Sequence, residues 1–193
     1  MELDIRRQAV DRAYRDHADD VYRVAYAILR DPEAAMDATQ ESFARAFERW
    51  DRYDPHRPLR AWLHGIAAHA ALDSLRRRRV RRLLHGGRIT EIAVRDPSSS
   101  PDPAVGIARR QVMDDALGSL KPLPRAAVVL RHVYGYDYEQ IAAVLGTSAG
   151  NVGSMLTRAH GALRERLAIT DPSSRPAIGG RRSPHVDTEA THD

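Results

Sequence analysis

The sequence predicts an all-α protein made of two small helical domains joined by a flexible linker, the second containing a helix-turn-helix. Apolar residues recur at three- and four-residue spacing in both halves, and no alternating strand pattern competes with them. Residues 96–103 hold three prolines and three serines, a composition typical of linkers. We therefore expect domains at residues 5–84 and 108–168, a linker at 85–107 and a disordered tail at 169–193.

The first domain is expected to hold three helices. Apolar residues at helical spacing mark the first helix over residues 9–28. Asp31 and Pro32 form a start signal for the second helix, because aspartate caps a helix N-terminus and proline suits the first turn. The third helix starts near Leu59 and runs into the arginine block at residues 76–79.

The second domain is expected to hold helices at residues 112–120, 124–132, 138–145 and 149–167, of which the last two form the helix-turn-helix. Gly146 accepts the left-handed turn conformation and Ser148 can cap the following helix. An apolar stripe of that helix is expected to be buried, and the opposite face would then meet solvent or a major groove. The stripe is Val152, Leu156, Ala159, Leu163 and Leu167, and the opposite face is Asn151, Ser154, Thr157 and Arg158. An ordinary helical hairpin is the alternative.

Composition narrows the class of protein. The chain of 193 residues has a net charge of +4, a pI near 9.7 and no cysteine, which excludes disulfides, thiolate zinc sites and a cysteine nucleophile. The arginine block would attract nucleic acid or an anionic membrane, and the second is disfavoured because no apolar face accompanies it. No signal peptide and no apolar run near the ~18 residues of a membrane span is present, so we expect a cytoplasmic protein without membrane insertion. The nine histidines lack metal-ligand spacing, and no catalytic motif is found, so no metal, cofactor or enzyme activity is expected.

Two sets of motifs then carry a family resemblance. The first set is Asp37-Ala-Thr-Gln40-Glu41-Ser-Phe43, Arg57-Pro58-Leu-Arg60-Ala61-Trp62-Leu63, Ile66-Ala67, Asp73 and the block from Arg76 to Arg79. The second set is Leu120-Lys-Pro-Leu-Pro124-Arg125, Val129-Leu130-Arg131, Gly135-Tyr-Asp-Tyr138-Glu139-Gln140-Ile141-Ala142, Leu145-Gly146-Thr-Ser148, Val152, Leu156 and Arg158-Ala159. With both sets in this order, the chain resembles the extracytoplasmic-function group of the sigma-70 family of bacterial RNA polymerase sigma factors.

The resemblance implies a sigma factor that binds core RNA polymerase and directs promoter-specific transcription initiation, with an anti-sigma factor as a further partner. The first domain would dock on core polymerase and melt the −10 promoter element, and the second would bind the −35 element. The polymerase-binding residues would be Asp37, Gln40, Glu41 and Phe43. The −10 contacts would be Arg57, Arg60, Trp62, His64, His69, Asp73, Arg76 and Arg77. The −35 contacts would be Tyr138, Ser148, Ala149, Asn151, Ser154 and Arg158.

The physical properties of these residues agree with the implied roles but leave alternatives. Asp37 and Glu41 share a helical face, which suits a cationic partner surface but also an acid–base pair, a metal site or a plain solvated face. Trp62 could stack on an exposed base or belong to the core. A stand-alone helix-turn-helix regulator, or a sigma-like protein that binds polymerase without starting transcription, also stays open.

The chain departs from the family pattern at several positions where cationic or polar groups are usual. These positions hold Gly65, Ala68, His69, Gly153, Met155 and His160, and Ala38 stands where leucine is usual. Each lost phosphate contact would reduce the salt dependence of DNA binding by about one unit of slope. We therefore expect the isolated second domain to bind DNA poorly.

Overall fold

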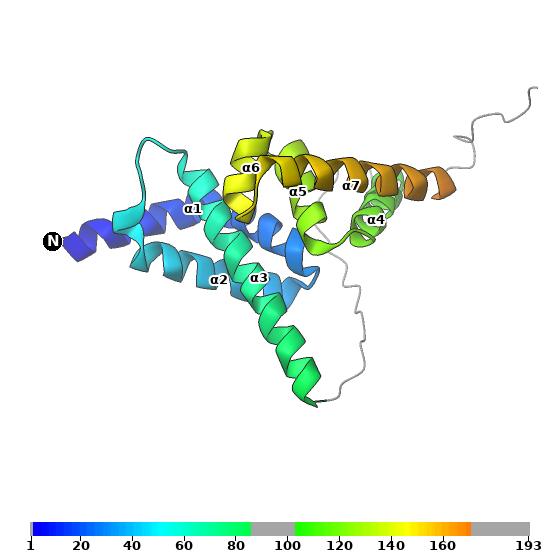
Figure 1. Cartoon of the computed structure of the whole chain (residues 1–193). Helices are drawn as coiled ribbons and strands as arrows, with labels where there is room; N and C mark the ends of the chain where they lie inside the picture. Colours follow the sequence, from blue (N-terminus) through cyan, green and yellow to red (C-terminus); the bar gives the residue numbers. More distant parts are fainter. Residues whose placement is uncertain (1, 86–102, 171–193) are drawn as a thin grey trace, which may run out of the picture.

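The computed structural model describes residues 2–85 and 103–170, which form seven α-helices and one short 3₁₀ turn and contain no strand (Figure 1). The all-α prediction is confirmed. In chain order the helices are α1 (Glu2–Leu29), α2 (Pro32–Glu48), α3 (Leu59–His85), α4 (Pro103–Gly118), α5 (Pro122–His132), α6 (Tyr138–Leu145) and α7 (Ala149–Thr170), and the 3₁₀ turn is Trp50–Arg52.

The helix boundaries agree with the predictions except at the start of α1, which begins at Glu2 and not at residue 9, and around the linker. Helix α4 begins at Pro103, inside the segment predicted as linker, because proline is compatible with the first turn of a helix. Helix α7 continues to Thr170, two residues past the predicted domain end. The rest of the predicted linker, residues 86–102, and most of the predicted tail, residues 171–193, lie outside the described residues.

Helices α1, α2 and α3 pack against one another as the first unit. Its interior combines large side chains on α1 and α3 with alanines on α2, so that the helix axes approach closely. The fully buried members include Val21, Val24, Ile28, Ala35, Ala46, Leu63 and Ala67. Burial of each aliphatic side chain of the size of Ile28 or Leu63 stabilises the fold by about 1.5–3 kcal/mol.

Asp31 starts α2 and also ties it to α3. Its carboxylate accepts a hydrogen bond from the backbone amide of Ala34 at 3.1 Å, and it forms an ion pair with Arg78 at 2.8 Å. These two interactions, of which the amide contact is the larger, lower the pKa of the Asp31 carboxyl. The predicted N-cap is therefore confirmed, and it has a second partner in the arginine block.

Helices α4 to α7 form the second unit, in which α5 and α6 pack on α7. Between α5 and α6 the chain turns through Tyr134, Gly135 and Tyr136, and Gly135 has a φ of 69°, a conformation that glycine adopts without strain. The Tyr136 amide donates a hydrogen bond to the Leu130 carbonyl at 3.1 Å. This turn projects two aromatic side chains from the end of α5.

The two units lie in direct contact, with α1 against α5 and α3 against α6 (Figure 1). Arg125 of α5 is only 5% exposed and donates hydrogen bonds to carbonyls at the ends of α1 and α4. Its partners are Ala27, Ile28 at 3.2 Å, Gly118 and Leu120 at 3.3 Å, and Leu117 at 3.5 Å. Burial lowers the pKa of Arg125 to about 10, so the guanidinium remains charged at neutral pH beside the negative ends of two helix dipoles.

Candidate nucleic-acid and polymerase interfaces

The predicted helix-turn-helix is formed by α6, the turn at Gly146 and α7. Asp137 and Gln140 cap α6 reciprocally, each side chain accepting the other's backbone amide, at 2.8 and 3.0 Å. Gly146 has a φ of 64°, and the Thr147 amide donates to the Ala142 carbonyl at 3.0 Å. Ser148 caps α7 as predicted, because its Oγ accepts the Asn151 amide at 3.3 Å.

The outward face of α7 presents three of the predicted −35 residues. Asn151, Ser154 and Arg158 are exposed, and they lie three or four residues apart on one side of the helix. The Asn151 side chain donates to the Thr147 Oγ at 2.8 Å, and Arg158 Nε donates to the Ser154 carbonyl at 3.2 Å. A surface of amide, hydroxyl and guanidinium groups on one helix face can donate to and accept from base edges in a major groove.

Ala149 and Tyr138, two further predicted −35 residues, lie beside this face and not on it. Ala149 is the first residue of α7 and is half-buried. Tyr138 is exposed at the start of α6, and its ring lies 3.5 Å from the position that a Cβ on Gly153 would occupy. The guanidinium of Arg131 lies 5.6 Å from the centre of the same ring. Tyr138 therefore shields Gly153, which stands where a cationic or polar group is usual in the family.

Met155 was wrongly placed among the lost DNA contacts. It is 5% exposed and lies on the buried stripe with Val152, Leu156 and Ala159. Met155 follows Val152 by three residues and precedes Ala159 by four. Residues at these spacings share one face of a helix, so Met155 is buried with them. An arginine at 155 would carry its charge into the interior, so methionine costs no contact with DNA.

The residues predicted to bind polymerase on α2 differ in their exposure to solvent. Asp37 and Gln40 are exposed, and Glu41 is partly exposed. Glu41 forms ion pairs with Arg45 and with Arg77 of α3, the second at 3.2 Å. A partner that binds Glu41 must therefore compete with two arginines of the same chain.

Phe43 does not belong to that face. It is buried and makes an edge-on contact with Tyr14, with ring centres 4.9 Å apart, so its prediction as a surface contact is corrected to a core residue. Met36, which the sequence interpretation missed, is exposed one residue before Asp37 and one turn before Gln40. An exposed methionine beside acidic and amide groups adds apolar contact area to this surface.

Trp62 lies in an aromatic cluster at the start of α3. Its ring is 5.9 Å from Trp50 and 5.1 Å from Tyr53, measured between ring centres, and it is half-buried. The Tyr53 hydroxyl donates to the Arg57 carbonyl at 2.8 Å, which holds the loop before α3, while the Arg57 side chain stays exposed. The ring therefore packs on one side as a core residue would, and stacking on a base stays a prediction for the part of its surface that is open.

The predicted −10 residues on α3 lie on two different sides of the helix. Arg60 and His64, four apart, form one side, while Trp62, His69 and Asp73 form another. His69 is exposed, donates from Nδ1 to the Gly65 carbonyl at 2.7 Å, and has its Nε2 3.3 Å from the position of a Cβ on Gly146. The turn of the helix-turn-helix therefore touches α3 directly.

His64 is fully buried, contrary to its prediction as a DNA contact. It is 0% exposed and is covered by the turn between α5 and α6, where the Tyr136 hydroxyl and the His64 Nδ1 share a hydrogen bond of 3.1 Å. The Tyr134 ring lies edge-on at 4.5 Å between ring centres. Burial, and then the nearby charges of Arg60 and His17, lower the pKa of His64 to about 3. In this arrangement the imidazole is neutral and inaccessible to DNA.

Gly65 and Ala68, the departures from the family pattern on α3, differ in the space that a longer side chain would have. Ala68 is fully buried, so a charged side chain at that position would disturb the core. Gly65 has open space around the position of a Cβ, so a longer side chain there could reach solvent. Only Gly65 of these two is therefore a lost surface contact.

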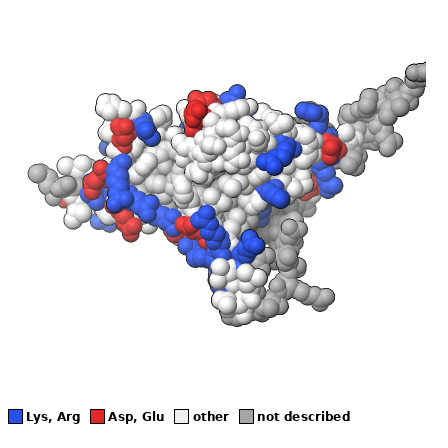
Figure 2. Space-filling model, in the orientation of Figure 1, with Lys and Arg blue, Asp and Glu red and all other residues white. Residues whose placement is uncertain are grey.

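Lys and Arg side chains gather in a band on one face, from the N-terminal side of the molecule to the projecting end of α3 (Figure 2). Carboxylates interrupt the band. Asp73 pairs with Arg45 at 3.3 Å and with Arg76 at 3.0 Å, and Arg77 and Arg78 pair with carboxylates of α2 and its cap. The band is a surface that phosphate groups could track, but several of its guanidinium groups are already paired.

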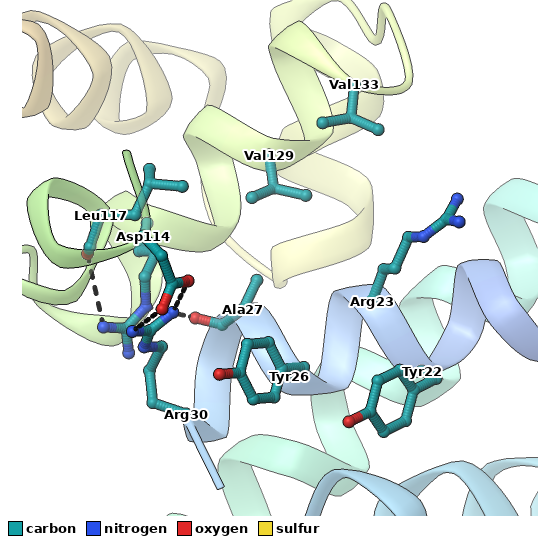
Figure 3. A pocket seen from close by; sticks show the side chains of 10 residues that line it. Tyr22, Arg23, Tyr26, Ala27, Arg30, Asp114, Leu117, Val129 and Val133 are labelled. Atoms are coloured by element: carbon teal, nitrogen blue, oxygen red, sulfur yellow. Dashed lines mark hydrogen bonds and ion pairs between the residues drawn. The ribbon is translucent and has the colours of Figure 1, made fainter. Parts of the chain in front are cut away.

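A groove of about 200 Å³ separates α1 from α4 and α5 (Figure 3). Its walls combine aliphatic side chains of α5 with the stacked rings of Tyr22 and Tyr26, whose centres lie 6.0 Å apart. Arg30 and Asp114 close one end, with Arg30 Nη2 donating to Asp114 Oδ2 at 2.6 Å. The sequence contains no pattern that predicts the groove-lining residues. Arg125 is the exception, because a single arginine inside an apolar run indicates a buried cation.

Across residues 2–85 and 103–170, no three histidine, aspartate or glutamate side chains gather in a way that could hold a metal ion. In the same ranges, no helix is both long and apolar enough to cross a bilayer.

Comparison with known families identifies both units. The family described as sigma-70 region 2 matches residues 13–81, and the family described as sigma-70, region 4 matches residues 110–163. The chain is 39% identical to the ECF RNA polymerase sigma factor SigE of Mycolicibacterium smegmatis over 166 residues, covering 82% of this chain and 61% of that protein. It is 32% identical to the RNA polymerase sigma-E factor of Streptomyces coelicolor over 163 residues, covering 83% of this chain and 87% of that protein.

The chain belongs to the extracytoplasmic-function group of the sigma-70 family. The resemblance inferred from the two motif sets is confirmed, and with it the assignment as a sigma factor. Among solved structures, the sigma factor RpoE of Bartonella quintana, in complex with the anti-sigma factor NepR, shares the fold with a TM-score of 0.69 and 23% identity over 83% of this chain and 98% of that chain. CnrH, in complex with the cytosolic domain of CnrY, gives a TM-score of 0.59 and 26% identity over 86% of this chain and 91% of that one.

Proposed function

We propose that this sigma factor binds core RNA polymerase through the exposed side of α2 and reads promoter DNA through α7 and α3. The observation that carries the proposal is the outward face of α7, where Asn151, Ser154 and Arg158 stand on a helix held rigidly by a capped turn. That face has the dimensions and chemistry of a major-groove reading helix. It is assigned to the −35 element.

On α2, we assign polymerase docking to Asp37, Gln40 and Glu41 together with Met36, which the structure adds to the predicted set. Their exposure and acidic character support contact with a cationic partner surface. Phe43 contributes by supporting α2 from beneath.

On and before α3, we assign −10 contacts to Arg57, His69, Arg76 and Arg77, which are exposed. Trp62 offers part of its ring for stacking on an unpaired base. Arg60 is exposed as well, beside the Tyr134 and Tyr136 rings, whereas His64 can join them only when the turn between α5 and α6 moves away. Asp73 is assigned to holding Arg45 and Arg76 in position.

The partners follow from this assignment. Core polymerase and promoter DNA are required together, and an anti-sigma factor is proposed because RpoE is seen in complex with the anti-sigma factor NepR. The family is not known for enzymes, and we propose that the chain acts by binding alone. Because polymerase and DNA occupy the bacterial cytoplasm, the chain is assigned to that compartment.

Reconstituted transcription tests the proposal. The full chain is mixed with core polymerase from Mycolicibacterium smegmatis and a library of randomised promoter fragments, and the transcripts are sequenced. We expect start sites downstream of one shared two-part sequence. Formation of the polymerase complex without any transcript would favour the sigma-like protein that does not initiate. Tight binding to a palindromic duplex without polymerase would favour the stand-alone regulator.

A further inference from the structure

We propose that His132 and His160 form a binding site for a divalent transition-metal ion of the class of Cu²⁺ or Ni²⁺, which joins α5 to α7. The two residues belong to different helices, and their Nε2 atoms face each other at 2.9 Å. The inference goes beyond the proposed function, because metal binding at this pair needs neither polymerase nor DNA.

Spacing along the chain does not reveal this pair. His132 and His160 are 28 residues apart, so no short metal-ligand motif contains both of them. The sequence-based expectation of no metal rests on such motifs. The packing of α5 on α7 creates the pair, and His160 is one of the positions where the chain departs from the family pattern.

The helix packing holds the two histidines in place. His132 is the last residue of α5, and His160 lies in the middle of α7. Leu130 and Ala159, which lie within two residues of them in the chain, are buried in the core. The two imidazole rings are 5.1 Å apart between centres, with an angle of 64° between their planes. Because both helices are fixed, binding of both rings to one ion costs little conformational entropy.

The distance between the two Nε2 atoms fits two neighbouring positions around a metal ion. With metal–nitrogen bonds of about 2.0–2.1 Å, nitrogens 2.9 Å apart subtend an angle of about 90° at the metal. A right angle belongs to the square-planar and tetragonal geometries that Cu²⁺ and Ni²⁺ prefer, and imidazole is a suitable ligand for both ions. Water would fill the remaining positions, since no group of three metal-binding side chains is found across residues 2–85 and 103–170.

The two rings can bind a metal ion without a net release of protons. In the hydrogen bond between them, one neutral ring donates from Nε2 and the other accepts at Nε2. Metal binding breaks this hydrogen bond. The donating ring then carries its proton on Nδ1 instead of Nε2, by exchange with water, so both Nε2 lone pairs bind the metal and both rings stay neutral.

The end of α5 favours a cation at this place. The aligned peptide dipoles of a helix leave partial negative charge at its C-terminus, where His132 lies. The adjacent arginine, Arg131, has other partners: its Nη1 donates to the Tyr136 carbonyl at 2.8 Å, and its guanidinium lies 5.6 Å from the centre of the Tyr138 ring. A metal ion bound to His132 would therefore gain from the helix end.

The site lies on the side of α7 opposite to its outward face. An α-helix turns by about 100° per residue, so His160 is rotated by about 200° from Arg158 and by about 180° from Asn151. A metal ion at the pair would therefore leave the face assigned to the −35 element open. It would link α7 to α5 and stabilise the helix pair that supports this face.

Titration of the full chain with Cu²⁺, without an affinity tag, tests the site. Calorimetry at neutral pH compares the wild type with His132→Gln, His160→Gln and the variant that carries both substitutions. We expect each single substitution to weaken the tightest copper site on the order of 100-fold, because the second imidazole acts as an intramolecular ligand. The double variant should bind copper no more weakly than either single variant, since one loss already breaks the chelate.

Two controls accompany this titration. His56→Gln, in an exposed loop, should keep the wild-type copper affinity. Mg²⁺, which prefers oxygen ligands, should not compete with copper, whereas Ni²⁺ should occupy the same site more weakly.

A second measurement locates the ion in the wild-type protein, so it applies even if a glutamine variant does not fold. Cu²⁺ at less than one equivalent broadens the NMR signals of nearby amides, because the ion is paramagnetic. We expect the amides of Val133 and Gly161, the neighbours of the pair, to lose intensity first. The amide of His56 should keep its intensity.

Each outcome decides for or against the metal site. Equal copper affinity of the wild type and the double variant, a loss in only one of the single variants, or first broadening around another histidine would overturn it. Equal losses in both single variants with broadening centred on the pair would support it. None of these results depends on transcription, so failure of the metal site and failure of the sigma activity are observed separately.

Discussion

The Arg30 guanidinium and the Asp114 carboxylate form a two-point ion pair between the end of α1 and α4, although the residues lie 84 positions apart in the sequence (Figure 3). The hydrogen bond to Asp114 is the main cause that raises the pKa of Arg30. Arg30 has a φ of 54°, so the chain adopts a left-handed conformation that places this side chain at the junction of the two units.

Asp114→Asn should weaken the junction modestly. The carboxylate is partly exposed, so solvent screening limits the loss to about 0.5–1 kcal/mol of unfolding free energy. Chemical denaturation at neutral pH measures it, and raised salt should shrink the difference. Asp19→Asn, at an exposed position on α1, is the control and should change stability little.

Arg125→Met should cost more, about 2–4 kcal/mol of unfolding free energy, because several carbonyls at the ends of α1 and α4 lose their donor in a buried site. Arg125→Lys should recover only part of the loss, since one ammonium cannot reach the same set of carbonyls. Urea unfolding followed by circular dichroism gives the values, with Arg164→Met as the exposed control. Equal stability of the methionine variant and wild type would contradict the role assigned to Arg125.

Acidification should destabilise the folded protein through His64. Its pKa is about 3 in the folded protein and about 6.5 when exposed, so the neutral form is bound preferentially. Stability is therefore complete above about pH 6.5 and falls as the pH drops from there towards 3. At pH 5 the loss is about 2 kcal/mol.

The histidine contribution is isolated by comparison with His64→Gln. The groups that face the ring are Arg60 on α3, His17 on α1, and Tyr134 and Tyr136 on the turn, and the two basic groups add to the effect. Between pH 7.5 and pH 5, the unfolding free energy of His64→Gln should therefore fall by about 2 kcal/mol less than that of the wild type. His56→Gln, in an exposed loop, should keep the wild-type profile.

Two glycine substitutions should act in opposite directions. Gly153→Ala should stabilise the protein by about 0.5–1 kcal/mol, because α7 gains helix propensity and the new Cβ meets the Tyr138 ring at an ordinary contact distance. Gly146→Ala should destabilise it, because φ is 64° and the Cβ would lie 3.3 Å from His69 Nε2. Thermal unfolding of both variants decides the signs, and a lower melting temperature for Gly153→Ala would contradict the contact described here.

Asn151→Ala and Arg158→Ala should each reduce transcription from the selected promoter by roughly tenfold, since a good base contact is worth about 1–3 kcal/mol. Arg164→Ala, an exposed arginine further along α7, should leave the yield nearly unchanged. The assay is the reconstituted reaction with core polymerase. A uniform effect of all three variants would indicate general electrostatic attraction and not reading of bases.

Helix starts and turns were predictable from single residues, whereas the contact between the two units was not. Asp31 and Gly146 act over three or four residues, so their positions in the sequence are enough to predict a helix start and a turn. Phe43 and Met155 are buried, as their spacing on the buried stripes indicates, although the family resemblance implies surface roles at these positions.

The contact between the two units depends on other kinds of residues. Arg125, His64 and Tyr136 are polar or aromatic, and their burial results from partners more than 70 residues away. No local pattern distinguishes such residues from surface positions. The predicted poor DNA binding of the isolated second domain remains a prediction, although its basis now excludes Met155.

Because one buried guanidinium binds the last carbonyls of both α1 and α4, the two units cannot part without loosening the helices that meet there. Withdrawal of α5 would leave the carbonyls of Ala27 and Ile28 to water and allow the final turn of α1 to fray. Separation of the units would therefore include local melting as well as displacement of rigid bodies. A partner that holds the frayed end of α1 in an ordered conformation would favour separation of the units without touching DNA.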